Sequence, residues 1–120
     1  MSISEAESAV MSVLWDSAPR TSEEILAVLS QSHGWQEGTV KSLLNRLLKK
    51  QAVKADRDGK RYLYSPLLER ADYVSEESAG LLDRLFDGRV APLVAHFSHH
   101  RKLSKKDIAE LRQLLDKLDD

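Results

Sequence analysis

One short stretch of the sequence, GTVKSLLNRLLKK at residues 38–50, is rich in side chains that donate hydrogen bonds. The ammonium and guanidinium groups suit anionic oxygens, and the carboxamide of Asn45 offers a donor and an acceptor side by side. No carboxylate interrupts this stretch, although exposed helices usually alternate acids with bases. Its chemistry therefore suits a surface that carries negative charge and a pattern of hydrogen-bonding groups.

The apolar residues of the same stretch predict a helix that presents the polar side chains on one face. They share one side at about 100° per residue, and they are Val40, Leu43, Leu44, Leu47 and Leu48. An α-helix fits the major groove of B-DNA, where residues in its first half reach base edges and flanking cations hold phosphates. If the partner is DNA, we expect base contacts from Gly38, Thr39, Lys41, Ser42 and Asn45.

Each of these residues has a chemical reason to lie at the bases. Gly38 permits close approach of the backbone, Lys41 can donate to guanine, and Asn45 can pair with adenine through two hydrogen bonds. Thr39 or Ser42 can touch a phosphate or a thymine methyl group. The later cations of the helix are expected at phosphates, and they are Arg46, Lys49 and Lys50.

The charge of the chain is unevenly distributed. Residues 37–64 hold eight bases and three acids, whereas the remaining residues hold ten bases and sixteen acids. The net charge of -1 thus hides a basic patch in an otherwise acidic chain. A lysine-rich helix can also be a merely solvated face, so the elements around it matter.

The neighbouring segments predict a winged helix-turn-helix domain. Capping boxes begin helices at Ser4 with Glu7, at Thr21 with Glu24 and, further along, at Ser104 with Asp107. On the second helix Ile25, Val28 and Leu29 are expected to face inward, and Gly34 precedes the basic helix. After residue 50 the alternation has a period of two around Asp58-Gly59, which predicts a β-hairpin wing. The order of elements is that of a winged domain, with the third helix as the reader. Three wing cations are expected at phosphates or in the minor groove, namely Arg57, Lys60 and Arg61.

Beyond Pro66 the sequence predicts three further amphipathic helices, at about 68–87, around 90–97, and at 104–118. We predict a mainly α protein in two parts, a winged helix-turn-helix domain at 1–66 and a helical dimerisation region at 67–120. A second copy would cover the apolar faces, and the alternative is a monomer whose helices fold back on the first domain. The expected dimerisation residues are Leu81, Leu82, Leu85, Phe86, Val90, Leu93, Val94, Phe97, Ile108, Leu111, Leu114, Leu115 and Leu118.

The sequence resembles the BlaI/MecI/CopY family of bacterial repressors over nearly its whole length. The segments that carry the resemblance, in order, are ISEAESAVMSVLW, TSEEIL, GTVKSLLNRLLKK, RYLYSP and LLDRLFDGRVAPLVAHFSHHRKLSKKDIAELRQLLDKL. The resemblance implies a homodimer that binds a roughly palindromic DNA operator through two winged domains and blocks transcription.

The resemblance also implies a route of induction. In the antibiotic-resistance members a membrane metalloprotease receptor senses a β-lactam, and the repressor is then cut at an Asn-Phe bond. The equivalent bond in this chain is His96–Phe97, so histidine stands where those members have asparagine. The copper-responsive branch carries a cysteine-rich tail motif, and this chain has no cysteine. The family resemblance therefore does not extend to copper sensing by that motif.

The histidines and tryptophans allow several interpretations. His96, His99 and His100 have a spacing that zinc, nickel or copper sites use, but they also suit a solvated helix end or the specificity of a cleavage loop. We expect these histidines to lie at a solvated helix end, and we predict no metal and no cofactor. His33 is expected to be structural or near a phosphate. Trp15 and Trp35 are expected in the core rather than as platforms for stacked bases.

Other function classes find little support in the sequence. Phosphate-binding glycine loops, G-x-S-x-G and H-E-x-x-H are all missing, so we expect no enzyme. No signal-peptide pattern or membrane-spanning run occurs, and the absence of cysteine fits a reducing cytoplasm, which is the expected location. The main alternative function is a protein-binding adaptor or dimerisation module built on a winged domain.

Overall fold

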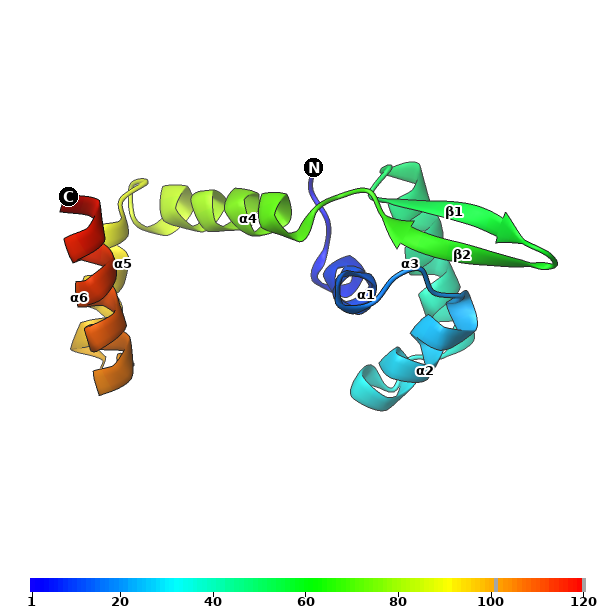
Figure 1. The fold of residues 1–120 in the computed structure, drawn as a ribbon, viewed down its shortest axis with the longest axis horizontal. Coiled ribbons are helices and arrows are strands. Elements are labelled where there is room, and N and C mark those ends of the chain that lie inside the picture. Colours follow the sequence, from blue (N-terminus) through cyan, green and yellow to red (C-terminus); the bar gives the residue numbers. More distant parts are fainter. Residues whose placement is uncertain (101, 120) are drawn as a thin grey trace. The chain divides into compact units, whose positions relative to one another are not determined.

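The computed structural model describes residues 1–100 and 102–119, which form two packing units. The first unit, Met1–Val74, holds three helices and a hairpin: α1 (Glu5–Asp16), α2 (Ser22–His33), α3 (Glu37–Lys49), β1 (Val53–Asp58) and β2 (Arg61–Pro66) (Figure 1). Helix α4 (Arg70–Leu85) begins in this unit. The second unit starts at Ser75 and holds the rest of α4, then α5 (Val90–His99) and α6 (Lys105–Asp119).

Capping boxes begin the helices at the predicted residues. The Ser4 amide donates to Glu7 Oε1 over 2.8 Å, and the Glu7 amide donates back to Ser4 Oγ. Thr21 and Glu24 repeat this arrangement at α2. At α6 the Asp107 amide donates to Ser104 Oγ over 3.0 Å. These bonds satisfy amide groups that have no partner within the helix, so each helix begins where the sequence predicts it.

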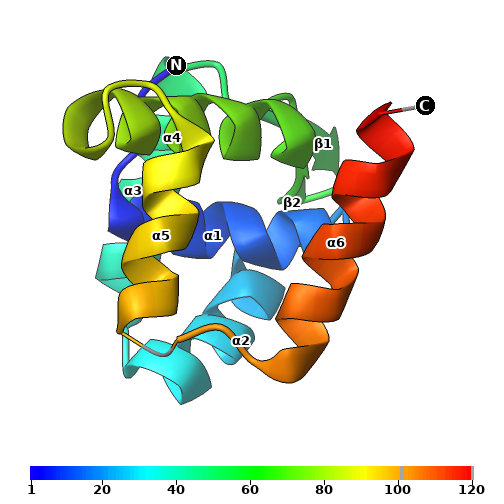
Figure 2. The same ribbon diagram turned by 90° about the vertical axis from the view of Figure 1, so that its left-hand side faces the viewer.

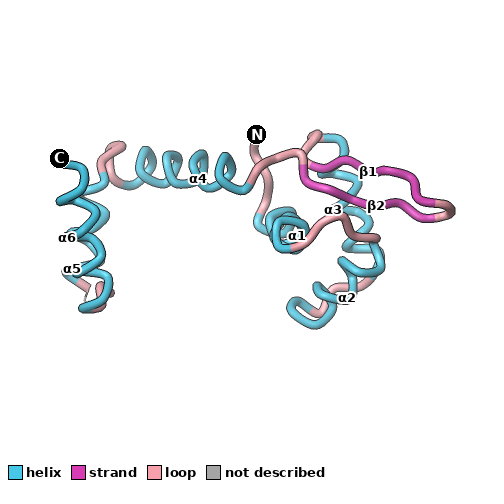
Figure 3. The backbone as a smooth tube through the Cα atoms, viewed as in Figure 1, coloured by secondary structure: helices cyan, strands magenta, loops and turns pink. Residues whose placement is uncertain are grey.

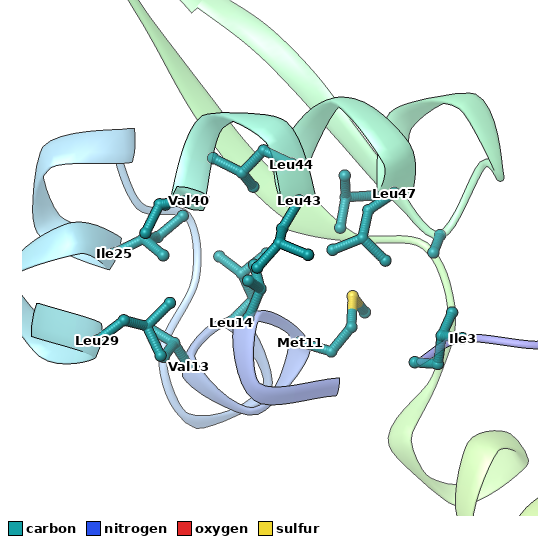
Figure 4. Packing of buried hydrophobic residues seen from close by; sticks show 13 residues of the cluster. Ile3, Met11, Val13, Leu14, Ile25, Leu29, Val40, Leu43, Leu44 and Leu47 are labelled. Carbon is teal, nitrogen blue, oxygen red and sulfur yellow. The ribbon is translucent and has the colours of Figure 1, made fainter. Parts of the chain in front are cut away.

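The core of the first unit lies between the apolar side of α3 and the two preceding helices. Figure 4 shows side chains of α3 pointing toward α1 and α2. The fully or almost fully buried residues include Met11, Leu14, Ile25, Leu29, Val40, Leu43, Leu44 and Leu47. One expectation is wrong: Val28 was predicted to face inward with Ile25 and Leu29, but it is 40% exposed. Its place on α2 is about 100° from that of Leu29, which carries it to the edge of the apolar stripe.

The hairpin forms as predicted, with its turn one residue later than expected. Asp58 pairs with Arg61 as the last antiparallel pair, so Gly59 and Lys60 make the turn (Figure 3). Gly59 has φ 66°, a conformation that glycine adopts without steric cost. A third short segment joins the wing, because Arg20 and Tyr64 exchange backbone hydrogen bonds of 3.1 and 2.8 Å.

The first unit extends beyond the predicted boundary at residue 66. The indole Nε1 of Trp15 donates to the carbonyl oxygen of Leu68 over 2.9 Å, and the rings of Trp15 and Tyr73 lie 5.5 Å apart. Leu68 and Tyr73 also pack against the core, so the start of α4 belongs with the winged domain. Both tryptophans pack against that core, which confirms the structural role expected for them.

Within residues 75–100 and 102–119, the second unit has helices but no buried core of its own. None of the described residues of α4, α5 and α6 is buried. Helices α5 and α6 run in opposite directions, as Figure 2 shows. Large apolar side chains lie exposed on them, including Phe97, Leu114 and Leu118, the last at 81%.

Helix α4 ends with two residues in the left-handed conformation. Asp87 has φ 52° and Gly88 has φ 73°, and the Gly88 amide donates to the Leu82 carbonyl oxygen over 2.8 Å. The glycine stop expected at residue 88 is therefore present, but Asp87 shares the turn. None of the helices in residues 1–100 and 102–119 combines the length and the apolar character that a membrane crossing requires.

Candidate nucleic-acid interface

The polar face of α3 is exposed along its whole length. All five predicted base-reading residues lie on it without burial: Gly38, Thr39, Lys41, Ser42 and Asn45. Gly38, Ser42, Asn45 and Lys49 follow one another at spacings of four, three and four residues, so they form a single stripe along the helix. Apart from its chain neighbours and the nearby backbone of α3 itself, no atom of the described residues lies within 4 Å of the position that a Cβ on Gly38 would take. The start of the stripe is therefore open to a close approach by another molecule.

Lys41 forms an ion pair with an acid that was not among the predicted site residues. Its Nζ lies 2.7 Å from Glu37 Oε1, one helical turn earlier, and both side chains are exposed. The hydrogen bond between them lowers the pKa of Glu37 and raises the pKa of Lys41, so the pair stays ionised around neutral pH. A base contact by Lys41 would require this exposed pair to open or to share the ammonium, which a weak surface ion pair permits.

The start of α3 differs from the starts of α1, α2 and α6. Its N-cap residue, Gln36, makes no side-chain hydrogen bond to the helix. The amides of Glu37 and Gly38, at the positive end of the helix dipole, therefore receive no cap from the Gln36 side chain, whereas the Thr39 amide donates to the Gln36 carbonyl oxygen over 3.1 Å. Such amides are suitable donors for a phosphate oxygen.

The flanking cations divide into free and engaged groups. Within the described chain, no carboxylate lies within ion-pair distance of Arg46 or Lys49. Lys50 is different, because its Nζ donates to Glu7 Oε1 over 2.7 Å and to the Ser2 carbonyl oxygen over 3.1 Å. We therefore leave Lys50 out of the phosphate contacts that we propose below.

The wing carries its cations near the tip. Lys60 lies in the turn itself, and the Arg57 Nε donates to the carbonyl oxygen of Gly59 over 3.1 Å. The Arg57 guanidinium also lies 5.9 Å from the ring centre of Tyr62, its partner on the opposite strand. Arg61 pairs with Asp58 at 3.2 Å. The wing thus presents three cations around one turn, of which Arg61 is partly neutralised.

The acids of the basic segment form ion pairs that were not predicted from the sequence. All three, namely Glu37, Asp56 and Asp58, pair with a base of that same segment. The spacing of four between Glu37 and Lys41 was a readable signal for a helical ion pair. The contact between Glu7 and Lys50 had no such signal, because 43 residues separate the two.

The three histidines of the tail gather at the end of α5 without forming a metal-binding group. The ring centres of His96 and His100 lie 4.6 Å apart, and those of His99 and His100 lie 5.3 Å apart. Among the described residues, no three His, Asp or Glu side chains are placed to hold one metal ion. The His96–Phe97 bond lies inside α5, and both side chains are exposed.

Comparison with known sequences gives matches along nearly the entire chain. The family model described as Penicillinase repressor matches residues 3–117. A penicillinase repressor of Bacillus licheniformis is 32% identical over 114 residues, which cover 95% of this chain and 89% of the relative. A methicillin resistance regulatory protein MecI of Staphylococcus aureus is 30% identical over 115 residues, which cover 96% of this chain and 94% of the relative.

Solved structures agree for the first unit. The DNA-binding domain of the repressor BlaI superposes with a TM-score of 0.55 at 34% identity, over 59% of this chain and 87% of that domain. The monomeric form of Bacillus licheniformis BlaI, solved in complex with the blaP half-operator, also gives 0.55, at 33% identity over 61% of this chain and 89% of that one. MarR from Escherichia coli, at 24% identity and a TM-score of 0.54 over 98% of this chain and 76% of MarR, is similar in fold alone.

The winged fold, the predominantly basic face of α3 and the match over residues 3–117 agree with one another, and the chain belongs to the penicillinase repressor family of transcriptional repressors.

Proposed function

We propose that this protein represses transcription by binding a palindromic operator as a homodimer, with α3 in the major groove and the hairpin wing on the flanking backbone. The observation that carries the proposal is the exposed stripe of α3, which has no carboxylate after Glu37 and an open position at Gly38. The related BlaI bound to a half-operator supports DNA as the partner.

The division of labour along α3 follows from the geometry of a helix in the groove. We assign base contacts to Gly38, Thr39, Lys41, Ser42 and Asn45, because they lie on the exposed face of α3 and precede its later cations. We assign phosphate contacts to Arg46 and Lys49 on α3, and to Arg57, Lys60 and Arg61 in the wing. Basic side chains that bind phosphates release condensed counterions from the DNA, so these residues supply affinity, whereas Asn45 supplies specificity.

The proposed homodimer rests on the second unit. Its helices bury none of their described residues, yet they expose leucines on α4 and α6 together with Val90 and Phe97 on α5. Contiguous apolar surface of this kind marks an interaction site in a water-soluble protein. A second copy offers an identical surface, and two-fold symmetry matches two half-sites of a palindrome.

The proposal is tested by titrating the full-length protein against the DNA upstream of its own gene and against random DNA, with fluorescence anisotropy at several salt concentrations. If the dimer neutralises roughly six or more phosphates, raising the salt concentration from about 50 to 200 mM should weaken binding on the order of a thousandfold. Asn45→Ala should cost about 1 to 3 kcal/mol on the operator and little on random DNA. Absence of any salt-sensitive complex would favour the protein-binding adaptor instead.

Induction by proteolysis at His96–Phe97, through a membrane metalloprotease receptor, is a prediction from the family resemblance. Because this bond lies within α5, a protease would have to unwind the helix locally before it could cut. Cutting there would remove α6 from the proposed dimer surface. The intact mass of the repressor in β-lactam-treated cells tests this: fragments that end at His96 would support it, and an unchanged mass would argue against this signal.

A further inference from the structure

We propose that the contact between Glu7 and Lys50 is a positioning device for DNA binding, which fixes the end of α3 and the start of the wing against α1. The inference rests on the function proposed above and gives Lys50 a role other than the phosphate contact that its charge suggests. Neither residue touches DNA in this proposal. The contact acts through the placement of the elements that do.

Glu7 is buried although it is an acid in a helix cap. It is 1% exposed, and its Oε1 accepts hydrogen bonds from the Ser4 amide and from the Lys50 ammonium. Its Oε2 is also buried and has no hydrogen-bond partner among the described residues. A cap by itself does not require burial, as the exposed Glu24 of the equivalent box on α2 shows. The burial of Glu7 therefore serves the contact with Lys50.

Lys50 brings three separate segments together. It follows the last residue of α3, and its ammonium reaches both Glu7 at the start of α1 and the carbonyl oxygen of Ser2 in the N-terminal arm. Ile3, the next residue of the arm, is buried in the core. A single cation thus joins the arm, α1 and the end of the proposed recognition helix.

The wing begins directly beyond this contact. Gln51 and Ala52 donate backbone hydrogen bonds to Leu48 and Leu47, and the Ala52 carbonyl oxygen accepts from the amides of Leu67 and Leu68. The junction of residues 50–53 therefore connects α3, the first strand and the segment that leaves the second strand. A shift here moves α3 and the wing relative to each other, and both must meet the same stretch of DNA.

The two possible roles of Lys50 make opposite predictions for Glu7→Gln. If Lys50 is a phosphate ligand, losing its acidic partner frees the ammonium, and DNA binding stays equal or becomes tighter. If the contact positions α3 and the wing, the same substitution weakens operator binding while every cation of the interface is retained. Lys50→Met separates the roles in a second way, because losing one phosphate contact in each subunit of the dimer lowers the slope of log affinity against log salt by about 2.

The experiment measures the full-length dimer on operator and random DNA across salt, at a temperature where circular dichroism shows each variant to be folded. For Glu7→Gln and Lys50→Met we expect the ratio of operator to random affinity to fall about tenfold, since misplacement by a fraction of an ångström disrupts base contacts first. We expect the salt slope to stay unchanged. The double variant Glu7→Gln/Lys50→Met should lose no more than either single variant, because one contact is removed in all three.

Two controls keep the outcomes distinct. Lys49→Met, an adjacent free cation, should lower the salt slope of the dimer by about 2, because one phosphate contact is lost in each subunit. Glu24→Gln changes the matched capping residue without a lysine partner and should leave the affinity ratio unchanged. A single variant that fails to fold is replaced by the double variant, which leaves no uncompensated buried charge.

The positioning role is refuted if the wild type binds its operator but Glu7→Gln keeps the wild-type ratio, or if Lys50→Met behaves like Lys49→Met. A reduced stability with an unchanged ratio would also refute it, because it would show a contribution to folding alone. If the wild type binds no DNA, the proposed function falls, and the positioning role falls with it.

Discussion

At Gly38 an added methyl group would meet no atom of the described residues within 4 Å, apart from its chain neighbours and the nearby backbone of its own helix. Its backbone also does not need glycine, because Gly38 is not among the residues with positive φ. Folding alone therefore gives no reason for glycine at the start of α3, where alanine has the higher helix propensity. A close approach to DNA does give one.

We predict that Gly38→Ala raises the free energy of unfolding by up to about 1 kcal/mol and weakens operator binding about tenfold or more, which corresponds to at least about 1.4 kcal/mol. Thermal unfolding and anisotropy titration on the same preparation measure both. If affinity is retained while stability rises, the backbone at residue 38 does not approach DNA.

Glu7 illustrates how a buried acid responds to its neighbours. Burial raises the pKa of Glu7, but the hydrogen bonds from Lys50 and Ser4 outweigh this effect, so its pKa lies below 4.5. A folded-state pKa below the unfolded value stabilises the protein above the unfolded pKa, and the contribution disappears as the pH falls through the folded pKa.

The stability difference between wild type and Glu7→Gln should therefore be largest above about pH 5 and should shrink below pH 4.5. Melting temperatures of the wild type and of Glu7→Gln between about pH 7 and pH 3 check this. Glu24→Gln is measured in the same way for comparison. A constant difference across this range would mean that the charge of Glu7 contributes nothing to stability.

At the scale of elements, α3 ends in a motif that usually contains glycine. The Gln51 amide donates to the Leu48 carbonyl oxygen and the Ala52 amide donates to that of Leu47, which is the pattern of a Schellman motif. Gln51 takes its left-handed position with φ 62°, which strains a residue that has a Cβ.

Gln51→Gly should relieve this strain and raise the free energy of unfolding by about 0.5 to 1 kcal/mol, after allowing for the greater entropy of glycine in the unfolded chain. Chemical denaturation measures the gain. Gln51→Ala is the matched control, because it keeps a Cβ and should give no gain. Equal effects of the two would show that the side chain of Gln51, rather than its φ, sets the stability of this turn.

The three capping boxes and the alternation of β1 and β2 show which elements are predictable. Each rests on residues three or fewer positions apart, and the structure confirms the boxes at Ser4, Thr21 and Ser104. The place of Val28 and the turn at Gly59-Lys60 were predicted less well. Both depend on how far one element turns relative to its neighbour, which local spacing determines only approximately.

At the scale of the whole molecule, the helices of the second unit expose large apolar side chains, which the proposed homodimer would cover. Leu115 and Leu118 are 59% and 81% exposed on α6. A charge at the centre of a close-packed apolar interface has no partner and loses its hydration, which opposes association.

Leu115→Glu is accordingly predicted to shift the protein from dimer to monomer, as light scattering coupled to size-exclusion chromatography would show. The monomer should bind a full operator at least about tenfold more weakly than the dimer, because it loses the effective concentration of the second domain. Binding to a half-operator should remain unchanged. Gln113→Glu, which adds the same charge about 200° away on α6, should stay dimeric. Loss of half-operator binding in Leu115→Glu would indicate instead that this residue supports the winged unit.

The sequence alone determined the helix starts, the apolar and polar faces of α3 and the existence of the wing, and its motifs carried the family resemblance. These features depend on residues close together in the chain, whose chemistry acts over one or two turns. Only the tertiary structure decided that Lys50 is bound to the buried Glu7, and that the first unit extends to Val74 through Trp15 and Tyr73. Such contacts join residues more than forty positions apart, and their geometry exists only after the intervening elements have packed.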